Sequence, residues 1–455
     1  MKITNNKRKA SNLQLDILRS IFSELSRRGV TYAMIHGRDI FNGNTSMSDV
    51  DIVFDESPRK TLSSILHEMQ KKGTFRIVQC LHYDVSECYY YILSINDEDG
   101  ISFLHLDCMY DPVGINSYFF PAPELLVNLK NDGDVPSPSI AAEFLYLVVK
   151  KSRKGKLDQA TKSDIESLFA SDRNACLALL EKYLDPETVA KIVAYIENGT
   201  MDKPGTLEGI HRLWRQQGPA RKVSIRIRRL AHDVIRKIYR LIKPSGIFVV
   251  FLGPDGSGKT TIAEGVLAES RDGFRKTFHF HWRPELLPRP GGKHKPSDHD
   301  GAPEPALKSK YGLFMSLLRF SYYYVDFILG YWIRIYPRKA ATSLVIGERY
   351  YYDILVHPER YGFSLPAWVY RVLIYFVPKP DMTILLANEA EVIAERKDEL
   401  PVEEIRRQLD AYRGVLRLAG NGIEVRTEGG IDDVVQNVSQ TVLNKTADKN
   451  RCCDS

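Results

Sequence analysis

The chain has 455 residues, which is too long for one hydrophobic core and predicts two or three domains. Hydrophobic residues make up 44% and charged residues 26%, a balance typical of a globular protein and unlike a disordered chain. The formal net charge of +6 suits anionic partners such as nucleotides, phosphosugars or a lipid surface, without selecting one of them.

Targeting and anchoring patterns are weak throughout the sequence. The six cysteines show neither a C-x-x-C pair nor metal-ligand spacing, and we interpret them as reduced thiols of a cytoplasmic protein. The basic N-terminus lacks the apolar segment of a signal peptide, and no apolar run predicts a membrane-spanning helix. The ending CCDS has Asp454 where a prenylation box needs an aliphatic residue, so residues 449–455 are expected to be a disordered tail.

Residues 1–130 predict an α+β domain. Helical spacing of apolar residues predicts a first helix that ends at Gly29, and a second helix is opened by Pro58. Alternating or continuous apolar runs predict strands over residues 31–37, 49–55, 75–81, 87–95 and 101–110.

Residues 131–243 are expected to form a helical extension and a linker helix. The pattern is helical over residues 137–198, and a Gly/Pro-rich loop is predicted over residues 198–209. Residues 221–243 predict an amphipathic helix with Arg226, Arg229 and Arg236 on its basic face. We interpret it either as a solvated helix docked on a domain or as a helix that adsorbs to an anionic membrane. Its apolar stripe consists of Ile227, Leu230, Val234, Ile238 and Leu241.

Residues 244–448 alternate between strand-like and helical patterns. Strands are expected over residues 247–253, 276–282, 342–350 and 382–388, with helical stretches between them. This alternation predicts an α/β domain with a parallel sheet and helices on both faces. A long Pro/Gly/His-rich loop is expected over residues 283–305.

A glycine-rich motif follows the first of these strands. The sequence GPDGSGKT matches G-x-x-x-x-G-K-[ST] and has the required strand before it and helix after it. Backbone N–H groups of such a loop surround phosphate oxygens, and the helix N-terminus adds positive potential. We therefore predict that Lys259 contacts the β- and γ-phosphates of ATP and that the Thr260 hydroxyl binds Mg²⁺. The predicted nucleotide-binding residues are Gly253, Gly256, Ser257, Gly258, Lys259, Thr260 and Thr261.

The C-terminal domain resembles the thymidylate kinase family over residues 247–443. The resemblance rests on GPDGSGKTT, on VIGERYYYDILVHPERYG, on PKPDMTILLANEAEVIAERKDEL and on EIRRQLDAYRGV, which occur in the family's order. HFHWRPELLPRPGG, together with ERYYYDILVHPERYG, more closely resembles thymidylate kinase-like proteins associated with bacterial surface-polysaccharide synthesis.

The resemblance implies roles for further residues. Asp255 would contact hydroxyls of the acceptor, and Arg349 would bind an acceptor phosphate. Arg396, with Lys397, would close over the transferred γ-phosphate, where the transition state spreads negative charge. Arg396 also fits a solvated face of a charged helix. Glu348 stands where the family usually has Asp and would orient a hydroxyl or a Mg²⁺-bound water.

The acceptor region departs most from the family pattern. Arg283 and Arg289 lie in an expanded loop, which indicates a larger or different acceptor than thymidylate. His279 and His281 alternate on a strand; without a third ligand, packing is the expected role rather than metal binding. One helix face either lines an acceptor cleft or holds a buried Arg–Asp pair. That face carries Arg319, Tyr322, Tyr323 and Asp326.

The N-terminal domain carries a second set of acidic residues. Asp49 and Asp51 share one face of a predicted strand, and Asp107 lies on a second predicted strand. Three carboxylates at adjacent strand ends could hold Mg²⁺ for attack on an α-phosphate. A glycine turn followed by Asp-x-Asp and a third acid resembles the nucleotidyltransferase superfamily. Gly37-Arg38 departs from the family's Gly-Ser or Gly-Gly turn, so both an active site and a binding domain without activity remain open.

Two phosphate-chemistry domains are therefore predicted in one chain. The leading hypothesis is an ATP-dependent phosphotransferase acting on a sugar, glycan or nucleoside monophosphate, with surface-polysaccharide synthesis as a candidate setting. The alternatives are a Mg²⁺-dependent nucleotidyltransferase and a nucleotide-gated scaffold on the inner face of the membrane. Nucleic acid is not an expected partner, and the oligomeric state is left open.

Overall fold

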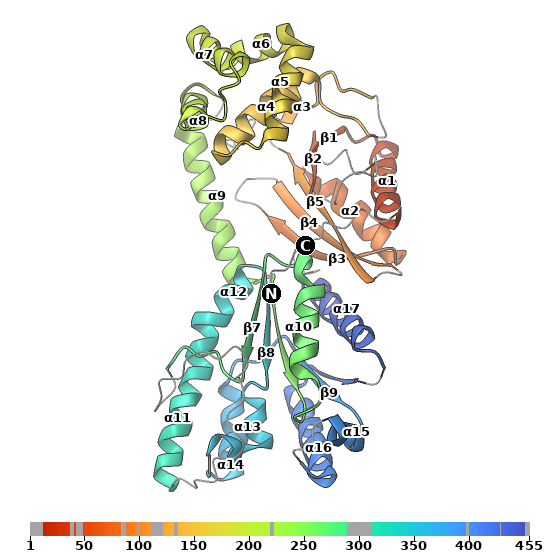
Figure 1. Cartoon of the computed structure of the whole chain (residues 1–455), viewed down its shortest axis with the longest axis vertical. Coiled ribbons are helices and arrows are strands. Elements are labelled where there is room, and N and C mark those ends of the chain that lie inside the picture. The colour runs from red at the N-terminus through yellow and green to blue at the C-terminus, as the bar shows by residue number, and fades with distance from the viewer. Residues whose placement is uncertain are drawn as a thin grey trace. The chain divides into compact units, whose positions relative to one another are not determined.

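The computed structural model describes residues 12–36, 41, 49–82, 88–97, 100–110, 122–131, 135–218, 223–288, 312–396, 400–427 and 429–450. The protein is α/β, and its contacts define an N-terminal unit that runs to Ile238 and a C-terminal unit that begins at Tyr239 (Figure 1). Several residues with predicted roles lie outside the described backbone or side chains, namely Gly37, Arg38, Arg226, Arg229, Arg289 and Lys397.

The N-terminal unit contains a five-stranded mixed sheet in the order β1-β2-β5-β4-β3. β2 is parallel to β5, whereas β1 is antiparallel to β2 and β3 is antiparallel to β4. The strands predicted from the sequence are confirmed, because alternating apolar residues give each strand at least one buried face. The strands are β1 (Tyr32–His36), β2 (Val50–Phe54), β3 (Arg76–His82), β4 (Cys88–Asp97) and β5 (Gly100–Met109).

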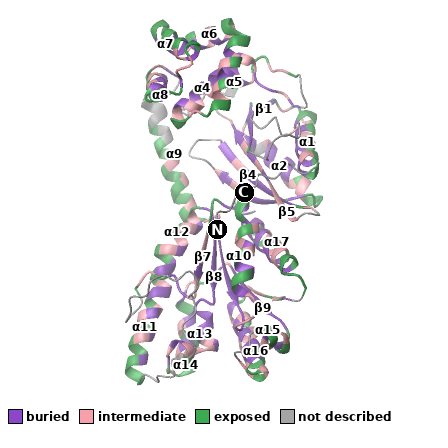
Figure 2. Ribbon diagram, in the orientation of Figure 1, coloured by how far each residue is buried: buried purple, intermediate pink, exposed green. Residues whose placement is uncertain are grey.

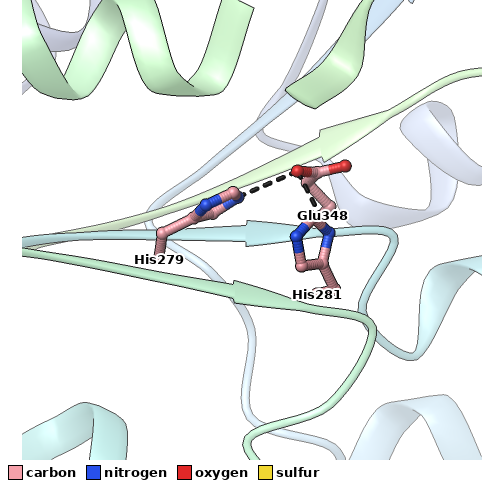
Figure 3. Close-up of side chains that lie close together, drawn as sticks. All are labelled: His279, His281 and Glu348. Carbon is pink, nitrogen blue, oxygen red and sulfur yellow. Dashed lines mark hydrogen bonds and ion pairs between the residues drawn. The ribbon is translucent and has the colours of Figure 1, made fainter. Parts of the chain in front are cut away.

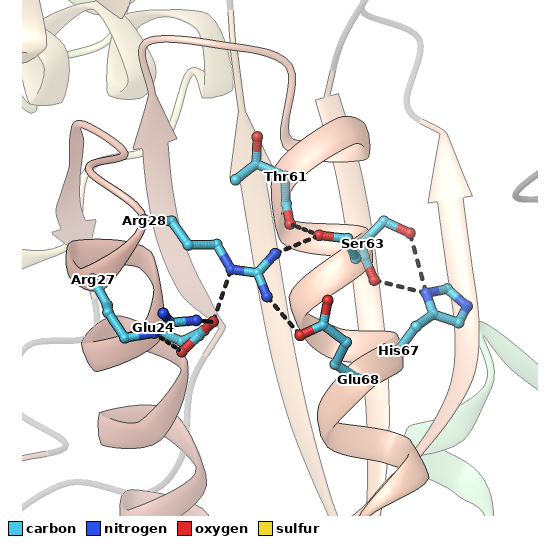
Figure 4. Close-up of polar contacts among 8 residues, drawn as sticks. Glu24, Arg27, Arg28, Thr61, Ser63, His67 and Glu68 are labelled. Carbon is cyan, nitrogen blue, oxygen red and sulfur yellow. Dashed lines mark hydrogen bonds and ion pairs between the residues drawn. The ribbon is translucent and has the colours of Figure 1, made fainter.

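Helices α1 (Asn12–Arg27) and α2 (Pro58–Lys71) cover one face of this sheet and share its core. Both were predicted, and Pro58 occupies the first turn of α2, where its missing N–H costs nothing. Arg28 ties the two helices together at the surface (Figure 4). Its guanidinium donates to Glu24 at 2.8 Å, to Ser64 at 2.9 Å and to Glu68 at 2.6 Å.

A group of helices packs on the other face of the same sheet. Ala33, Ile35 and Val53 of the sheet belong to one core with residues of these helices. Four helices begin at a side-chain cap, with Ser139, Asp158, Asp172 and Asp185 accepting from the first turn. The helices are α3 (Ala122–Leu125), α4 (Ile140–Lys154), α5 (Gln159–Ser171), α6 (Arg173–Glu181), α7 (Pro186–Glu197) and α8 (Thr206–Gln217).

Helix α8 corrects the predicted loop. The loop was expected to extend to residue 209, but the helix begins at Thr206, directly after Gly205 in a left-handed conformation. Leu207, Ile210 and Trp214 recur at helical spacing and are buried against the neighbouring helices. The free energy gained by burying this stripe outweighs the turn preference of the Gly and Pro residues that precede it.

Helix α9 (Val223–Ile242) confirms the predicted amphipathic helix. Its apolar stripe is exposed, with exposed fractions from 47% at Val234 to 67% at Leu230 (Figure 2). Among the described residues, no helix is both long and apolar enough to cross a bilayer.

The C-terminal unit contains a five-stranded, all-parallel sheet in the order β10-β9-β6-β8-β7. The predicted parallel sheet is confirmed; β6, β8 and β9 are buried along their whole length, as expected for strands covered on both faces. The chain visits β7 and β8 on one side of β6 and then β9 and β10 on the other. The strands are β6 (Ile247–Leu252), β7 (Lys276–His281), β8 (Ser343–Glu348), β9 (Met382–Ala387) and β10 (Gly422–Arg426).

Helices cover both faces of the parallel sheet (Figure 1). Phe248, Val250 and Leu252 of β6 belong to an aromatic-rich core shared with α11, α13 and α16. α10 packs against α17 so closely that a Cβ on Gly265 would lie 2.5 Å from Val435. The helices are α10 (Lys259–Glu269), α11 (Leu313–Gly330), α12 (Tyr336–Ala340), α13 (Tyr352–Val356), α14 (Ala367–Leu373), α15 (Ala390–Arg396), α16 (Val402–Ala419) and α17 (Ile431–Asn450).

Candidate functional site

The glycine loop lies at the carboxyl end of β6, the central strand, and leads into α10. Gly253, Gly256 and Gly258 have φ angles of 148°, 87° and 84°, which side chains other than hydrogen rarely allow. A Cβ on Gly253 would lie 2.6 Å from the Leu386 carbonyl oxygen and from Ser257 Oγ. The loop therefore needs glycine for its backbone path as well as for close packing.

Lys259 is the first residue of α10 and is 5% exposed. Its ammonium donates to the carbonyl oxygens of Gly253 at 2.8 Å and Pro254 at 2.7 Å, and it lies 3.7 Å from Asp255. Burial and the nearby Arg349 charge lower the pKa of Lys259 to about 8. A buried cation beneath a helix N-terminus makes the loop a strongly positive environment.

Glu348, at the end of β8, lies beside the start of α10. Its Oε2 accepts from the Thr260 hydroxyl at 3.0 Å, while its Oε1 lies 2.9 Å from His279 Nε2 and 3.2 Å from His281 Nδ1 (Figure 3). Burial alone would raise the pKa of Glu348, but hydrogen bonds from the two histidines outweigh it and hold that pKa far below its usual range. The carboxylate is thus ionised while only 2% exposed.

Arg349 and Tyr350 follow Glu348 in an unusual backbone conformation. Their φ angles are 66° and 51°, so two successive non-glycine residues occupy the left-handed region. The turn is held because the Arg349 N–H donates to the Phe251 carbonyl oxygen at 2.8 Å and Tyr350 is fully buried. Strain of this kind persists where surrounding packing fixes it, and it occurs often at functional sites.

An ion cluster joins this turn to the glycine loop. Asp255 pairs with Arg349 and, at 2.8 Å, with Arg360. Burial would raise the pKa of Asp255, but Arg349, Lys259 and Arg360 together lower it strongly. Burial would likewise lower the pKa of Arg349, whereas the charges of Asp353 and Asp255 raise it. Arg349 Nε is nevertheless buried and has no hydrogen-bond partner among the described residues.

Arg396, at the end of α15, lies at the same edge of the sheet. Its side chain is exposed and donates to the hydroxyl of Thr427 at 3.5 Å and to its carbonyl oxygen at 3.2 Å. Thr427 directly follows β10, so Arg396 contacts a neighbouring strand end rather than the glycine loop. Thr261 is exposed in the first turn of α10.

The two interpretations of the α11 face are decided by Asp326. This residue is fully buried and pairs at 2.8 Å with Arg283, which is 2% exposed. Asp326 also accepts from the Leu287 N–H at 2.7 Å. The buried Arg–Asp pair is present, but its arginine comes from the expanded loop and not from α11. Arg283 is consequently a structural residue, and Arg319 instead donates to the Tyr361 carbonyl oxygen.

The acidic residues of the N-terminal unit meet on two neighbouring strands. Asp51 and Asp107 are direct partners in the parallel pairing of β2 with β5. Burial and the Asp51 charge raise the pKa of Asp107 to about 7. Lys150 of α4 donates to Asp51 Oδ2 at 2.5 Å, while Asp49 accepts from Tyr90 at 2.8 Å and lies 3.3 Å from His105.

Sequence reasoning missed Lys150, Arg360 and the convergence of Glu348 on His279 and His281. Lys150 had a local indication, since it follows Tyr146 by one turn on the buried face of α4. The histidine–glutamate contact spans 69 residues and depends on the register of β7 against β8.

Within the described part of the chain, one group of three metal-ligand side chains converges to within 4.8 Å. It consists of His279, His281 and Glu348 and does not include the three aspartates. Comparison with models of known protein families finds no match to this chain, and neither does comparison with curated proteins.

Proposed function

We propose that the C-terminal unit is an ATP-dependent phosphotransferase that moves the γ-phosphoryl group to a sugar, a glycan or a nucleoside monophosphate. One observation carries the proposal: the glycine loop with Lys259 and the Glu348–Arg349 turn lie at the carboxyl ends of adjacent parallel strands, β6 and β8. In open α/β sheets, ligands bind outside these strand ends where the strand order reverses, as it does here beside β6.

The loop fits the phosphates of a nucleotide. Gly253 has no room for a Cβ, and Ser257 Oγ is buried with no hydrogen-bond partner among the residues that the structure describes. Lys259 would exchange the two loop carbonyls for β- and γ-phosphate oxygens, which would also restore its usual pKa. Thr260 and Glu348 offer the hard oxygen ligands that Mg²⁺ prefers. When bound there, Mg²⁺ would neutralise part of the phosphate charge.

Arg349 is the group best suited to the acceptor phosphate. Its Nε is buried and lacks a hydrogen-bond partner within the described part of the chain, while Asp255 holds Nη2 of the same guanidinium. Arg349 would thus hold the acceptor in line with the γ-phosphate and stabilise charge that develops during transfer. Arg396 holds Thr427 by two long hydrogen bonds at the protein surface, so it would leave that position at small cost to close over the nucleotide.

The test uses ATP labelled separately at the α- and γ-phosphorus, with Mg²⁺ and acceptors including thymidylate, sugar phosphates and a lysate glycan fraction. We expect label from the γ-position only, and none with Lys259→Ala. Transfer at the normal rate by Lys259→Ala would contradict the proposal. The same assay reports on the N-terminal unit, because a nucleotidyltransferase would transfer label from the α-position.

A second candidate is nucleotidyl transfer by the N-terminal unit. It is favoured by the register that pairs Asp51 with Asp107 beside Asp49. Two features oppose it. Lys150 forms an ion pair with Asp51, and burial together with the Asp51 charge raises the pKa of Asp107 to about 7, which disfavours the charged form that a metal ion needs. Metal binding there would require Lys150 to move. Transfer of α-label that is lost in Asp49→Ala/Asp51→Ala would establish this candidate.

A third role, at an anionic membrane surface, is favoured by the exposed stripe of α9. The full chain should then sediment with vesicles that contain phosphatidylserine and stay in solution with neutral vesicles. Leu230→Glu/Val234→Glu should abolish sedimentation. Equal binding of this variant and the unmodified chain would exclude α9 as the membrane contact.

A further inference from the structure

The side chains of His279, His281 and Glu348 converge from two adjacent strands. His279 and His281 are two residues apart on β7, so both rings lie on one face of the sheet. β8 runs parallel to β7, with Glu348 directly opposite His281. One carboxylate oxygen, Oε1, faces both rings, at 2.9 Å from His279 Nε2 and 3.2 Å from His281 Nδ1 (Figure 3).

These distances are close to those between ligands of one metal ion. Zinc–nitrogen and zinc–oxygen bonds of about 2.0–2.1 Å in a tetrahedron place ligand atoms about 3.3 Å apart. The His281–Glu348 distance of 3.2 Å is close to this separation, and the His279–Glu348 distance of 2.9 Å is somewhat shorter. The ligand atoms of the whole group lie within 4.8 Å, so small side-chain rotations of the two histidines would complete the geometry.

The surroundings suit an ion that enters from solvent. Glu348 is 2% exposed at its side chain, whereas His279 is 20% and His281 is 35% exposed. The buried carboxylate supplies a fixed negative charge, and the partly exposed imidazoles leave an entry path and open coordination positions. Two imidazoles with one carboxylate select zinc or another divalent transition metal over Mg²⁺, which prefers oxygen ligands alone.

We propose that His279, His281 and Glu348 bind one divalent transition-metal ion of the zinc class. Glu348 would also face Thr260, because its second oxygen accepts from that hydroxyl at 3.0 Å. Glu348 would therefore bridge the histidine-bound ion and the Mg²⁺ that accompanies ATP. This bridging part rests on the proposed phosphotransferase function, but metal binding by the three side chains does not.

The first experiment measures Zn²⁺ binding to the full chain without nucleotide, after removal of metals with a chelator. Competition with a chromophoric zinc chelator should give one site that weakens about a hundredfold in His279→Ala and in His281→Ala. Glu348→Gln keeps the size of the side chain but removes its charge, and it should also weaken binding strongly. His67→Ala replaces a histidine of α2 in the other unit and should leave the affinity unchanged.

Co²⁺ in place of Zn²⁺ gives a second measurement, because its visible spectrum reports nitrogen ligation directly. The Co²⁺ spectrum of the unmodified chain should be lost in His279→Ala/His281→Ala. A cooperative thermal unfolding transition of this variant, measured without metal, should confirm that it is folded. The proposal would be overturned if this double variant and the unmodified chain had the same Zn²⁺ affinity and the same Co²⁺ spectrum. The absence of any zinc site would also overturn it.

The two proposals can fail separately. The ammonium of Lys259 contacts Gly253, Pro254 and Asp255 and not the three ligands, so Lys259→Ala should lose phosphate transfer and keep its zinc site. A chain that binds zinc through the histidines but transfers no phosphate would refute the phosphotransferase and leave the metal site standing. Phosphate transfer by a chain that has no zinc site would refute the metal site and leave the phosphotransferase standing.

Discussion

Arg349 and Asp255 form an ion pair that joins the end of β8 to the glycine loop, with side-chain exposures of only 8% and 16%. Asp255 was expected to contact acceptor hydroxyls, but two arginines already bind it. In the proposed reaction, Asp255 would therefore orient Arg349 and Arg360. In that reaction, the positive charge that faces the acceptor would be fixed before any ligand arrives, which would lower the cost of ordering it.

Lys259→Ala should reduce γ-phosphoryl transfer at least about 10²- to 10³-fold in kcat, because a fixed cation opposite the developing charge is lost. The fold should be retained, since the contacts of the ammonium within the described residues are with two loop carbonyls and Asp255. Steady-state kinetics and thermal unfolding measure the two effects. Lys445→Ala, an exposed lysine of α17, should change neither quantity.

Arg349→Lys should raise the acceptor KM about tenfold or more while changing ATP affinity little. A lysine ammonium cannot hold Asp255 and present a second planar edge to a phosphate at the same time. Arg371→Lys is the matched exposed control on α14. If ATP affinity falls and the acceptor KM stays constant, Arg349 serves the nucleotide and the assignment is wrong.

Asp107→Asn should change how stability depends on pH. The folded pKa of about 7 lies above the ordinary value of 3.8, so the folded protein binds more protons than the unfolded chain between about pH 4 and 7. The contribution of Asp107 is thus fully present below pH 4 and is lost as the pH rises towards 7. Urea unfolding at pH 4.5 and 7.5 should show a smaller decrease for Asp107→Asn than for the unmodified chain. Equal decreases would mean that Asp107 is not the titrating group.

Asp326→Asn should destabilise the C-terminal unit by about 3–5 kcal/mol, because it leaves the buried Arg283 charge unpaired. Asp410→Asn removes an exposed carboxylate paired with Arg413 and should cost less than about 1 kcal/mol. Denaturant midpoints of the two variants give the comparison. Similar midpoints would show that the buried Arg283–Asp326 pair contributes no more to stability than an exposed pair.

Local pattern was enough to predict the glycine loop. Gly253, Lys259 and Thr260 lie within eight residues, and their chemistry depends mainly on the strand before them and the helix after them. The five strands of the N-terminal sheet and strands β6, β7, β8 and β9 were predicted for the same reason, since apolar residues repeat along each strand. Strand β10 was not predicted, and its residues are only partly buried or exposed. Helix α8 was missed in part because turn residues precede it, while its burial depends on helices elsewhere in the unit.

Contacts between distant segments could not be predicted. Lys150 contacts Asp51 across 99 residues of sequence. A lysine ammonium where Mg²⁺ was expected changes the chemistry predicted for the three aspartates. The histidines were assigned to packing because no third ligand was visible in the sequence near them. Glu348 supplies that third group only after β7 and β8 have paired in register. Arg283 was likewise assigned to the acceptor, because its buried partner lies on another element.

The fully buried Asp353 connects separate segments of the site. It accepts from Tyr361 at 2.5 Å and from Tyr412 of α16, and its charge also acts on Arg349, which holds Asp255 in the glycine loop. The glycine loop, the Glu348–Arg349 turn and helix α16 are thus connected by a chain of polar contacts. Loss of one contact in this chain would leave a buried polar group of the next without its partner. The amide hydrogens of these three segments should exchange with deuterium as one cooperative block, and Asp353→Asn should divide that block into independently opening parts.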